Sequence, residues 1–447
     1  MKIKRRKNIV ENPAKFFFLA YIITILIGGG LLSLPISSAA GEFTNPIDTT
    51  FTATSAVCVT GLVTKITASH WSAFGKLVII TLIQLGGLGV VTAAGALGLI
   101  LNKKFSVKDR LYIAEEKNEA TIHGMIKLLQ YILITTFTIE GIGALILSFK
   151  FIPEYGFGRG IAYSIFHAIS AFCNAGFDII GPVSLEGYVS DAHVSFTIAA
   201  LIVVAGLGFT VYKDILSGKK FSKMRLHTKV VLTMQAAFII LPAIFILLVE
   251  YNNPATIGNL SFGGKVVASI FQSVTPRTAG FASINQANIR SATLLITMFL
   301  MFIGGGPAGT AGGLKITTFF TLISATRANL RKQKDVTAFK RRMPKDLVEK
   351  AMSILIVSLV WIGVVTVIIS LTDVGFSLSN ILYEVISAYG TVGLTRGITP
   401  NLSSIAKLLI MLTMVFGKIG PLTMIYVFSN KSSSNAYREA EESILVG

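Results

Sequence analysis

Long apolar runs divide this chain and restrict it to one class of fold. They lie near residues 16–36, 74–101, 125–149, 193–217, 229–250, 291–326, 348–372 and 404–429. About 20 apolar residues are enough for a helix to cross the ~30 Å hydrocarbon core of a bilayer. With 52% hydrophobic and only 14% charged residues, the sequence predicts an all-α polytopic membrane protein with eight full spans.

Lys and Arg residues cluster in every second connection between these runs. They cluster at the N-terminus and in residues 102–110, 213–229 and 327–345, whereas residues 35–50 and 181–193 contain none. This asymmetry follows the positive-inside rule and predicts that both termini and the basic loops are cytoplasmic. It also accounts for the net charge of +18, so we expect no nucleic-acid partner.

A short motif that ends in glycine followed by Leu or Phe occurs four times. The copies are SAVCVTGL (55–62), SAFCNAGF (170–177), VTPRTAGF (274–281) and SAYGTVGL (387–394). Repetition at a nearly constant spacing indicates tandem structural units. The chain is therefore expected to consist of four repeats.

A short apolar segment precedes each copy of the motif. These segments are residues 46–57, 159–170, 262–274 and 378–389, all too short to span a bilayer. Backbone groups that are not paired within a membrane must be enclosed by protein or must line water. Each repeat is therefore predicted to be a span, a re-entrant half-helix, an extended glycine-containing filter loop and a second span.

Four such units can surround one pseudo-fourfold pore with their loops directed inward. Small residues let backbone carbonyls approach the axis, where they can replace the hydration shell of a cation. Residues 391–393 read TVG, the opening of the potassium-channel filter sequence. The predicted filter segments, whose carbonyls would bind potassium, are Val59, Thr60, Gly61, Asn174, Ala175, Gly176, Thr278, Ala279, Gly280, Thr391, Val392 and Gly393.

The second span of the third repeat is interrupted by GGGPAGTAGGLK, residues 304–315. Gly costs about 1 kcal/mol and Pro about 3 kcal/mol per helical position, so this run predicts a loop inside the membrane. A phosphate-binding loop is excluded, because Leu314 precedes Lys315 and no Ser or Thr follows directly. The alternatives are a flexible gate below the filter and a kink that serves packing alone. We expect no other span to be broken.

The chain resembles the superfamily of potassium-transporting membrane subunits that includes TrkH, HKT and KtrB, and is most similar to the KtrB type of the Ktr system. The resemblance covers the whole length. It is carried by ISAFCNAGF (169–177), SVTPRTAGF (273–281), GGGPAGTAGG (304–313) and GKIGPLT (417–423). No extra helix pair precedes the first repeat, which favours the KtrB type.

The resemblance implies a potassium uptake subunit in the bacterial cell membrane. It further implies a homodimer in the lipid bilayer, a cytosolic nucleotide-binding ring of the KtrA type as regulator, and sodium-stimulated transport. Potassium and sodium are the expected ions, and no organic cofactor is expected. The basic loops carry more Lys and Arg than topology requires, which predicts that they dock the regulator; contact with anionic lipids is the alternative.

The same resemblance assigns roles to further residues. The predicted gate consists of Gly304, Gly305, Gly306, Pro307, Gly309, Gly312, Gly313, Lys315 and Lys418. Lys418 stands where relatives commonly carry Arg, and would face the pore and bind carbonyls of the closed loop; extension to the cytoplasmic interface is the alternative. Arg277, which adjoins the third filter, is expected to tie down the loop there.

Other polar residues in the apolar regions carry weaker signals. Glu384 and His167 lie on half-helices and are expected to satisfy neighbouring backbone or hydroxyl groups. Arg396, near the fourth filter, would lower the local potassium concentration at the outer mouth. Glu140 is a lone acidic residue in a span, and a single acid is weak evidence for a proton relay. The two cysteines form neither a disulfide framework nor a zinc site.

The predicted organisation places each repeat between cytoplasmic segments. The ranges are a basic N-terminus (1–15), repeat 1 (16–101), a linker (102–124), repeat 2 (125–217), a linker (218–228), repeat 3 (229–326), a linker (327–347), repeat 4 (348–429) and a tail (430–447). The alternative function is an ion-coupled secondary transporter with alternating access, although such folds usually pair two repeats. The chain contains no hydrolase, metalloprotease or phosphate-loop motif, so we do not expect an enzyme.

Overall fold

The computed structural model describes residues 13–101, 105–116, 124–428 and 442. The predicted N-terminal and C-terminal cytoplasmic segments therefore lie almost entirely outside the described residues, as does much of the linker 102–124. Each predicted repeat opens with a long apolar helix. These helices are α1 (Pro13–Ser33), α7 (Met125–Tyr155), α11 (Leu226–Glu250) and α15 (Lys345–Thr372), and the four are long and apolar enough to cross a membrane.

Each long helix is followed by a short one at the position expected from the sequence. The short helices are α2 (Pro46–Val57), α8 (Phe157–Phe172), α12 (Phe262–Val274) and α16 (Leu378–Gly390). At a rise of about 1.5 Å per residue, none of them can span a hydrocarbon core of ~30 Å. The predicted half-helices are thus present in all four repeats.

The second span is broken in every repeat, so the expectation that only the third would be interrupted is wrong. Its two parts meet at 97° in α4 (Ala73–Leu88) and α5 (Val90–Ile100) and at 94° in α9 (Ala192–Ala205) and α10 (Phe209–Leu216). In the fourth repeat α17 (Ser404–Ile419) and α18 (Pro421–Phe428) meet at 105°. The bends occur at Gly89, Gly208 and Gly420, whose φ values of 91°, 89° and 97° are not helical and favour glycine.

In the third repeat the break is longer. Helix α13 (Ser291–Phe302) and helix α14 (Ile316–Leu330) are separated by residues 303–315. Among the described residues there are four spanning helices, or up to seven spans when each bent pair is counted once. The predicted repeat architecture is present, whereas the exact number of eight full spans is not confirmed.

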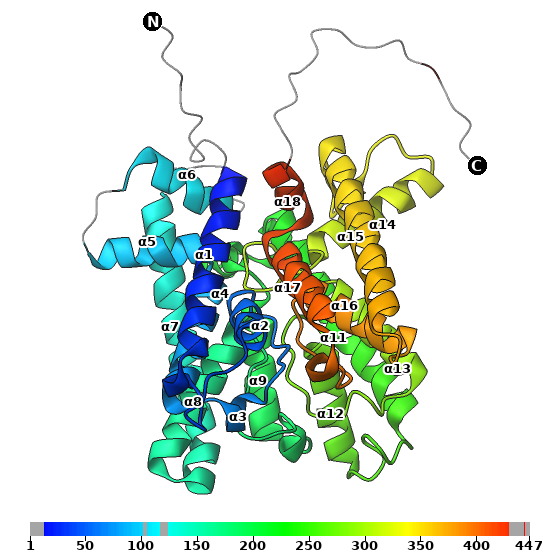
Figure 1. Cartoon of the computed structure of the whole chain (residues 1–447). Coiled ribbons are helices and arrows are strands. Elements are labelled where there is room, and N and C mark those ends of the chain that lie inside the picture. Colours follow the sequence, from blue (N-terminus) through cyan, green and yellow to red (C-terminus); the bar gives the residue numbers. More distant parts are fainter. Residues whose placement is uncertain (1–12, 102–104, 117–123, 429–441, 443–447) are drawn as a thin grey trace, which may run out of the picture.

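Short elements lie within the repeats and in the linkers between them. They are η2 (Pro35–Ser37), α3 (Thr67–His70), α6 (Val107–Glu116), η3 (Glu186–Tyr188), η4 (Phe221–Lys223), η5 (Thr399–Asn401) and the antiparallel strands β1 (Thr337–Ala338) and β2 (Arg341–Arg342). Helices α6, α14 and α18 lie at one end of the molecule and α3 lies at the other (Figure 1). Lys108 and Arg110 of α6 and the basic residues that follow α14 therefore lie at the same end, as the charge pattern predicts.

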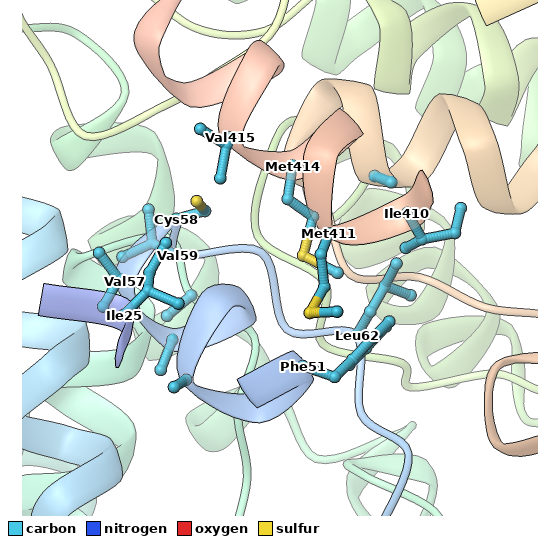
Figure 2. Close-up of a cluster of buried hydrophobic side chains, with 14 of the residues drawn as sticks. Ile25, Phe51, Val57, Cys58, Val59, Leu62, Ile410, Met411, Met414 and Val415 are labelled. Atoms are coloured by element: carbon cyan, nitrogen blue, oxygen red, sulfur yellow. The ribbon is translucent and has the colours of Figure 1, made fainter. Parts of the chain in front are cut away.

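Buried apolar side chains join the last repeat to the first. Figure 2 shows Phe51 and Leu62 of repeat 1 facing Ile410, Met411 and Met414 of α17. These side chains belong to one continuous buried cluster. Repeats 1 and 4 are thus neighbours in space, and the four repeats form a closed ring rather than an open row.

One buried carboxylate fixes the end of α11 to the start of α13. Glu250 is fully buried and accepts hydrogen bonds from the backbone N–H of Arg290 at 2.9 Å and from Thr293 Oγ1 at 2.5 Å. It also accepts from Asn253 Nδ2 at 2.6 Å and Thr256 Oγ1 at 2.9 Å. The carboxylate therefore satisfies donors at the N-terminus of α13, where negative charge is favoured.

We predict that Glu250→Ala lowers the stability of the protein, because it leaves buried donors without an acceptor, at about 1–3 kcal/mol for each unsatisfied group. The melting temperature of the purified protein in detergent measures the effect. Glu349→Ala, on an exposed side of α15, serves as the control. Equal melting temperatures for the two variants would contradict this assignment.

Candidate functional site

The four predicted filter segments (59–61, 174–176, 278–280 and 391–393) share one unusual backbone conformation. Each has a positive φ at its first and at its third residue. The first residues are Val59 (50°), Asn174 (58°), Thr278 (68°) and Thr391 (50°), and the third are Gly61 (96°), Gly176 (70°), Gly280 (78°) and Gly393 (95°). Three of the first residues are β-branched, and such side chains rarely adopt this region, at a cost of order 1–3 kcal/mol. The surrounding structure must therefore impose the conformation.

The glycines of these segments meet around a single axis. A Cβ atom built on Gly61 would lie 2.5 Å from the carbonyl oxygen of Ala175, and one built on Gly176 would lie 2.5 Å from that of Ala279. A Cβ atom built on Gly280 would likewise collide with the carbonyl oxygen of Val392, and one built on Gly393 would collide with that of Thr60. The four contacts form a closed circle. Each glycine thus abuts the carbonyl that precedes the glycine of the next repeat, and only glycine fits at each position.

Amide groups of the segments are directed away from the axis. The N–H of Thr60 donates to the carbonyl of Ser55 at 2.8 Å, and that of Ala175 donates to the carbonyl of Ser170 at 2.8 Å. The equivalent bonds in the other repeats are Ala279 to Thr275 at 3.1 Å and Val392 to Ser387 at 2.9 Å. No described residue donates a hydrogen bond to any carbonyl oxygen of the four predicted filter segments. These buried oxygens are available to a bound cation or to water.

Hydroxyl groups at the ends of the half-helices support the segments from behind. In repeats 1 and 4, Ser55 Oγ and Ser387 Oγ accept hydrogen bonds from the N–H groups of Gly61 (3.0 Å) and Gly393 (3.1 Å). In repeats 2 and 3 the hydroxyl is instead the donor, from Ser170 Oγ to Phe177 O at 2.7 Å and from Thr275 Oγ1 to Phe281 O at 2.6 Å. This role was not predicted from the sequence, although a Ser or Thr lies five or six residues before each glycine.

The predicted gate loop is held together at its two ends. The N–H of Gly304 donates to the carbonyl of Leu314 at 2.8 Å, and the N–H of Ile316 donates to the carbonyl of Gly305 at 3.1 Å. These bonds bring the end of α13 and the start of α14 side by side. The residues between them consequently project as a closed loop instead of continuing the span.

This loop packs directly against the filter segments of repeats 3 and 4. A Cβ atom added to Gly312 would collide with the side chain of Thr391, and one added to Gly304 would lie 3.4 Å from Thr278 Cγ2. The loop also contacts the breaks in the neighbouring second spans. In the loop, Gly306 contacts Gly206, and Pro307 and Gly309 contact Gly208. Gly313 of the loop contacts Gly417.

Two lysines bind carbonyls of the loop. Lys418 Nζ donates to the carbonyl of Thr310 at 2.8 Å, and Lys315 Nζ donates to the carbonyl of Ala311. A cavity of about 290 Å³ on this side of the loop is lined by both lysines, by Gly309 and by Glu116 of α6. The predicted gate residues therefore lie together, between this cavity and the ring of glycines.

Arg277 connects the third filter segment to the gate loop. Its Nη2 atom donates to the carbonyl of Gly304 at 3.3 Å, and its guanidinium lies 5.6 Å from the ring centroid of Phe238. The side chain is buried. The contact joins the third predicted filter segment to the start of the loop 304–315.

Arg396 is engaged by neighbouring groups. It donates to Asn380 Oδ1 at 2.7 Å and to the carbonyl of Ala287 at 2.8 Å, so it links repeat 4 to repeat 3. A second charged contact joins the repeats at Asp48 of α2, whose carboxylate lies 3.0 Å from Lys407 of α17. Neither connection between repeats was predicted, because Ala287 and Asp48 lie far in sequence from the residues they contact.

The remaining polar residues of the half-helices and spans bind their neighbours. Glu384 accepts hydrogen bonds from Thr395 (2.9 Å) and Thr399, and His167 Nδ1 lies 2.7 Å from the carbonyl oxygen of Tyr163. Glu140 accepts a hydrogen bond from Gln84 Nε2 at 3.1 Å. The two cysteines are free and buried, and the described residues contain no cluster of His, Cys, Asp and Glu that could hold a metal.

Comparison with known proteins agrees with this architecture. Residues 3–439 match the family model described as TrkH, a cation transport protein. The chain is 42% identical to the potassium/sodium uptake protein NtpJ of Enterococcus hirae, over 100% of this chain and 99% of the relative. It is 41% identical to the Ktr system potassium uptake protein B of Bacillus subtilis, over 95% of this chain and 94% of the relative.

A solved structure shows the same fold at low sequence identity. The potassium transporter TrkH from Vibrio parahaemolyticus superposes with a TM-score of 0.76 and 15% identity, covering 96% of this chain and 87% of that chain. The predicted resemblance to KtrB-type subunits and the prediction of a transporter instead of an enzyme are confirmed by these relatives. The match over nearly the whole sequence shows that the chain belongs to the TrkH family of cation transport proteins.

Proposed function

We propose that the chain is the membrane-embedded, ion-translocating subunit of a potassium uptake system. The observation that carries the proposal is the closed ring of glycines with carbonyl oxygens that accept no hydrogen bond from the described residues. A ring of backbone carbonyls can replace the hydration shell of potassium. The full-length relatives named as potassium uptake proteins support the choice of ion.

The loop 304–315 is proposed to gate this path. It lies against Thr391 and Thr278 on one side and borders the cavity that contains Lys418 on the other. Because α14 continues from the loop to the basic linker, a partner that moves the linker can displace the loop. The arrangement described above corresponds to a closed state, in which the charge of Lys418 also opposes the entry of cations.

A cytosolic nucleotide-binding ring of the KtrA type is the proposed regulator, and a homodimer in the bacterial cell membrane is the proposed assembly. One relative is named Ktr system potassium uptake protein B. Because that name refers to a system, it supports the presence of a partner subunit. Sodium stimulation is proposed because another relative is named for potassium and sodium uptake. The basic connections at one end of the molecule support cytoplasmic termini.

Alternating access is the second candidate function. The observation in its favour is that the second span is broken in every repeat, since discontinuous helices are common in secondary transporters. Four related segments around one axis nevertheless favour a filter, because alternating-access folds usually pair two repeats. The two functions differ in whether replacing one ring glycine changes ion selectivity.

We predict that replacing Gly61, Gly176, Gly280 or Gly393 with Ser lowers the selectivity for potassium over sodium. The new Cβ atom would collide with a backbone carbonyl at a residue whose φ is positive. Rubidium and sodium uptake in a bacterium that lacks its own potassium uptake systems measures the change. Gly363→Ser is the matched control, because a Cβ atom there meets nothing within 4 Å. Wild-type discrimination in all four ring variants would contradict the filter.

We predict that Lys418→Ala, or deletion of residues 309–313, raises uptake in the absence of the regulator. Loss of the charge-assisted bond to Thr310 removes about 1.5–3 kcal/mol of support for the closed loop before desolvation is counted. This corresponds to about a tenfold or greater shift toward the open state. Rubidium flux into proteoliposomes reports the effect, with Lys345→Ala on an exposed side chain as the control. If both gate variants insert normally and conduct no faster, the loop is a packing kink.

We predict that the basic linker docks the regulator through the exposed hairpin of β1 and β2. Arg342 at its edge pairs with Asp335 at 3.0 Å, while Lys340 and Arg341 are exposed. Reversal of Lys340, Arg341 and Arg342 to Glu should weaken co-purification of the regulator. Reversal of Lys2, Lys4 and Arg5 controls for general charge, and retention of the regulator by the hairpin variant at low and moderate salt would exclude docking there.

A further inference from the structure

An apolar cavity lies between α13, α14 and α15, outside the ring of filter segments. Its volume is about 620 Å³, within the ~300–1,000 Å³ range typical of small-molecule sites. Its wall is formed mainly by aromatic and aliphatic side chains. These are Phe299, Phe302, Phe319, Leu322, Ile323 and Leu355.

Two arginines line one end of the same cavity. Arg327 lies in the last turn of α14, Arg331 follows four residues later as the C-cap of that helix, and both are exposed. Their spacing places both guanidinium groups on one face of the helix. None of the residues that line the cavity is acidic, and within the described part of the chain neither arginine forms an ion pair at 4.0 Å or less.

We propose that this cavity is a binding site for an anionic phospholipid. The apolar wall suits an acyl chain, and the planar guanidinium groups suit a phosphate, which arginine binds in bidentate fashion. The charge pattern of the chain places the arginines at the headgroup level of the cytoplasmic leaflet, where anionic lipids attract basic residues. Basic pockets between spans at this level are known to suit such headgroups.

A second copy of the chain fits the cavity less well than a lipid. Two copies joined symmetrically at this face would place four arginine charges near one another without an acidic residue in either lining. Like charges at an interface are unfavourable. A lipid phosphate, in contrast, supplies the missing negative charge.

The site is connected to the loop that we propose as the gate. Phe302 lines the cavity, its carbonyl accepts a hydrogen bond from the N–H of Leu314 at 3.2 Å, and its ring stacks on Tyr389 at 5.6 Å. Helix α14 begins after the loop at Ile316, contains Arg327 and is followed directly by Arg331. A bound lipid would therefore contact the segments on both sides of the loop; this consequence rests on the proposed function, whereas lipid binding does not.

Native mass spectrometry of the purified full-length protein tests the site. With dioleoylphosphatidylglycerol we expect a retained adduct that is at least about tenfold weaker in the double variant Arg327→Gln/Arg331→Gln, from the loss of two basic residues. The double variant Lys219→Gln/Lys220→Gln, at another exposed basic loop, should retain the adduct. Dioleoylphosphatidylcholine should bind the wild type more weakly than the anionic lipid.

A second variant tests the apolar wall with both charges in place. Leu322→Trp fills the cavity and should reduce retention of the anionic lipid while Arg327 and Arg331 are unchanged. Equal retention by the wild type, the arginine variant and the tryptophan variant would overturn the proposal. So would a wild-type dimer that separates in the arginine variant regardless of lipid, because the cavity would then be covered by a second copy.

Discussion

Convergence of four backbone segments at four glycines is the constraint on which the rest of the structure depends. Each glycine lies so close to the next carbonyl that a methyl group could not fit. Carbonyls brought this close repel one another unless a cation or water lies between them. The half-helices, the hydroxyl groups of Ser55 and Ser387, and the contacts between repeats 4 and 1 all serve to hold these oxygens in place.

Much of this arrangement could be predicted from the sequence because it is local or repeated. The half-helices were found from apolar segments too short to span, and the filter segments from a glycine motif that occurs four times. The bends at Gly89, Gly208 and Gly420 were missed, because a single glycine within an apolar run does not by itself end a span. The loop at residues 304–315 could be predicted because six glycines and a proline leave no helical alternative.

Contacts between repeats could not be predicted from the sequence. The guanidinium of Arg396 binds Asn380 and the carbonyl of Ala287. Nothing near Arg396 in the sequence indicates these partners, since Ala287 belongs to another repeat. The same holds for Asp48 and Lys407, whose pairing links a half-helix of repeat 1 to α17.

Closure between the last repeat and the first has a consequence for biosynthesis. Gly393 faces the carbonyl of Thr60, so the ring contains a contact of very high sequence separation, and such contacts form slowly. A nascent chain that has completed three repeats still lacks one wall of the ring, and its polar carbonyls remain open toward the membrane interior. Assembly of the ring of glycines must therefore await translation of the final repeat, and truncated products are expected to be substrates for membrane quality control.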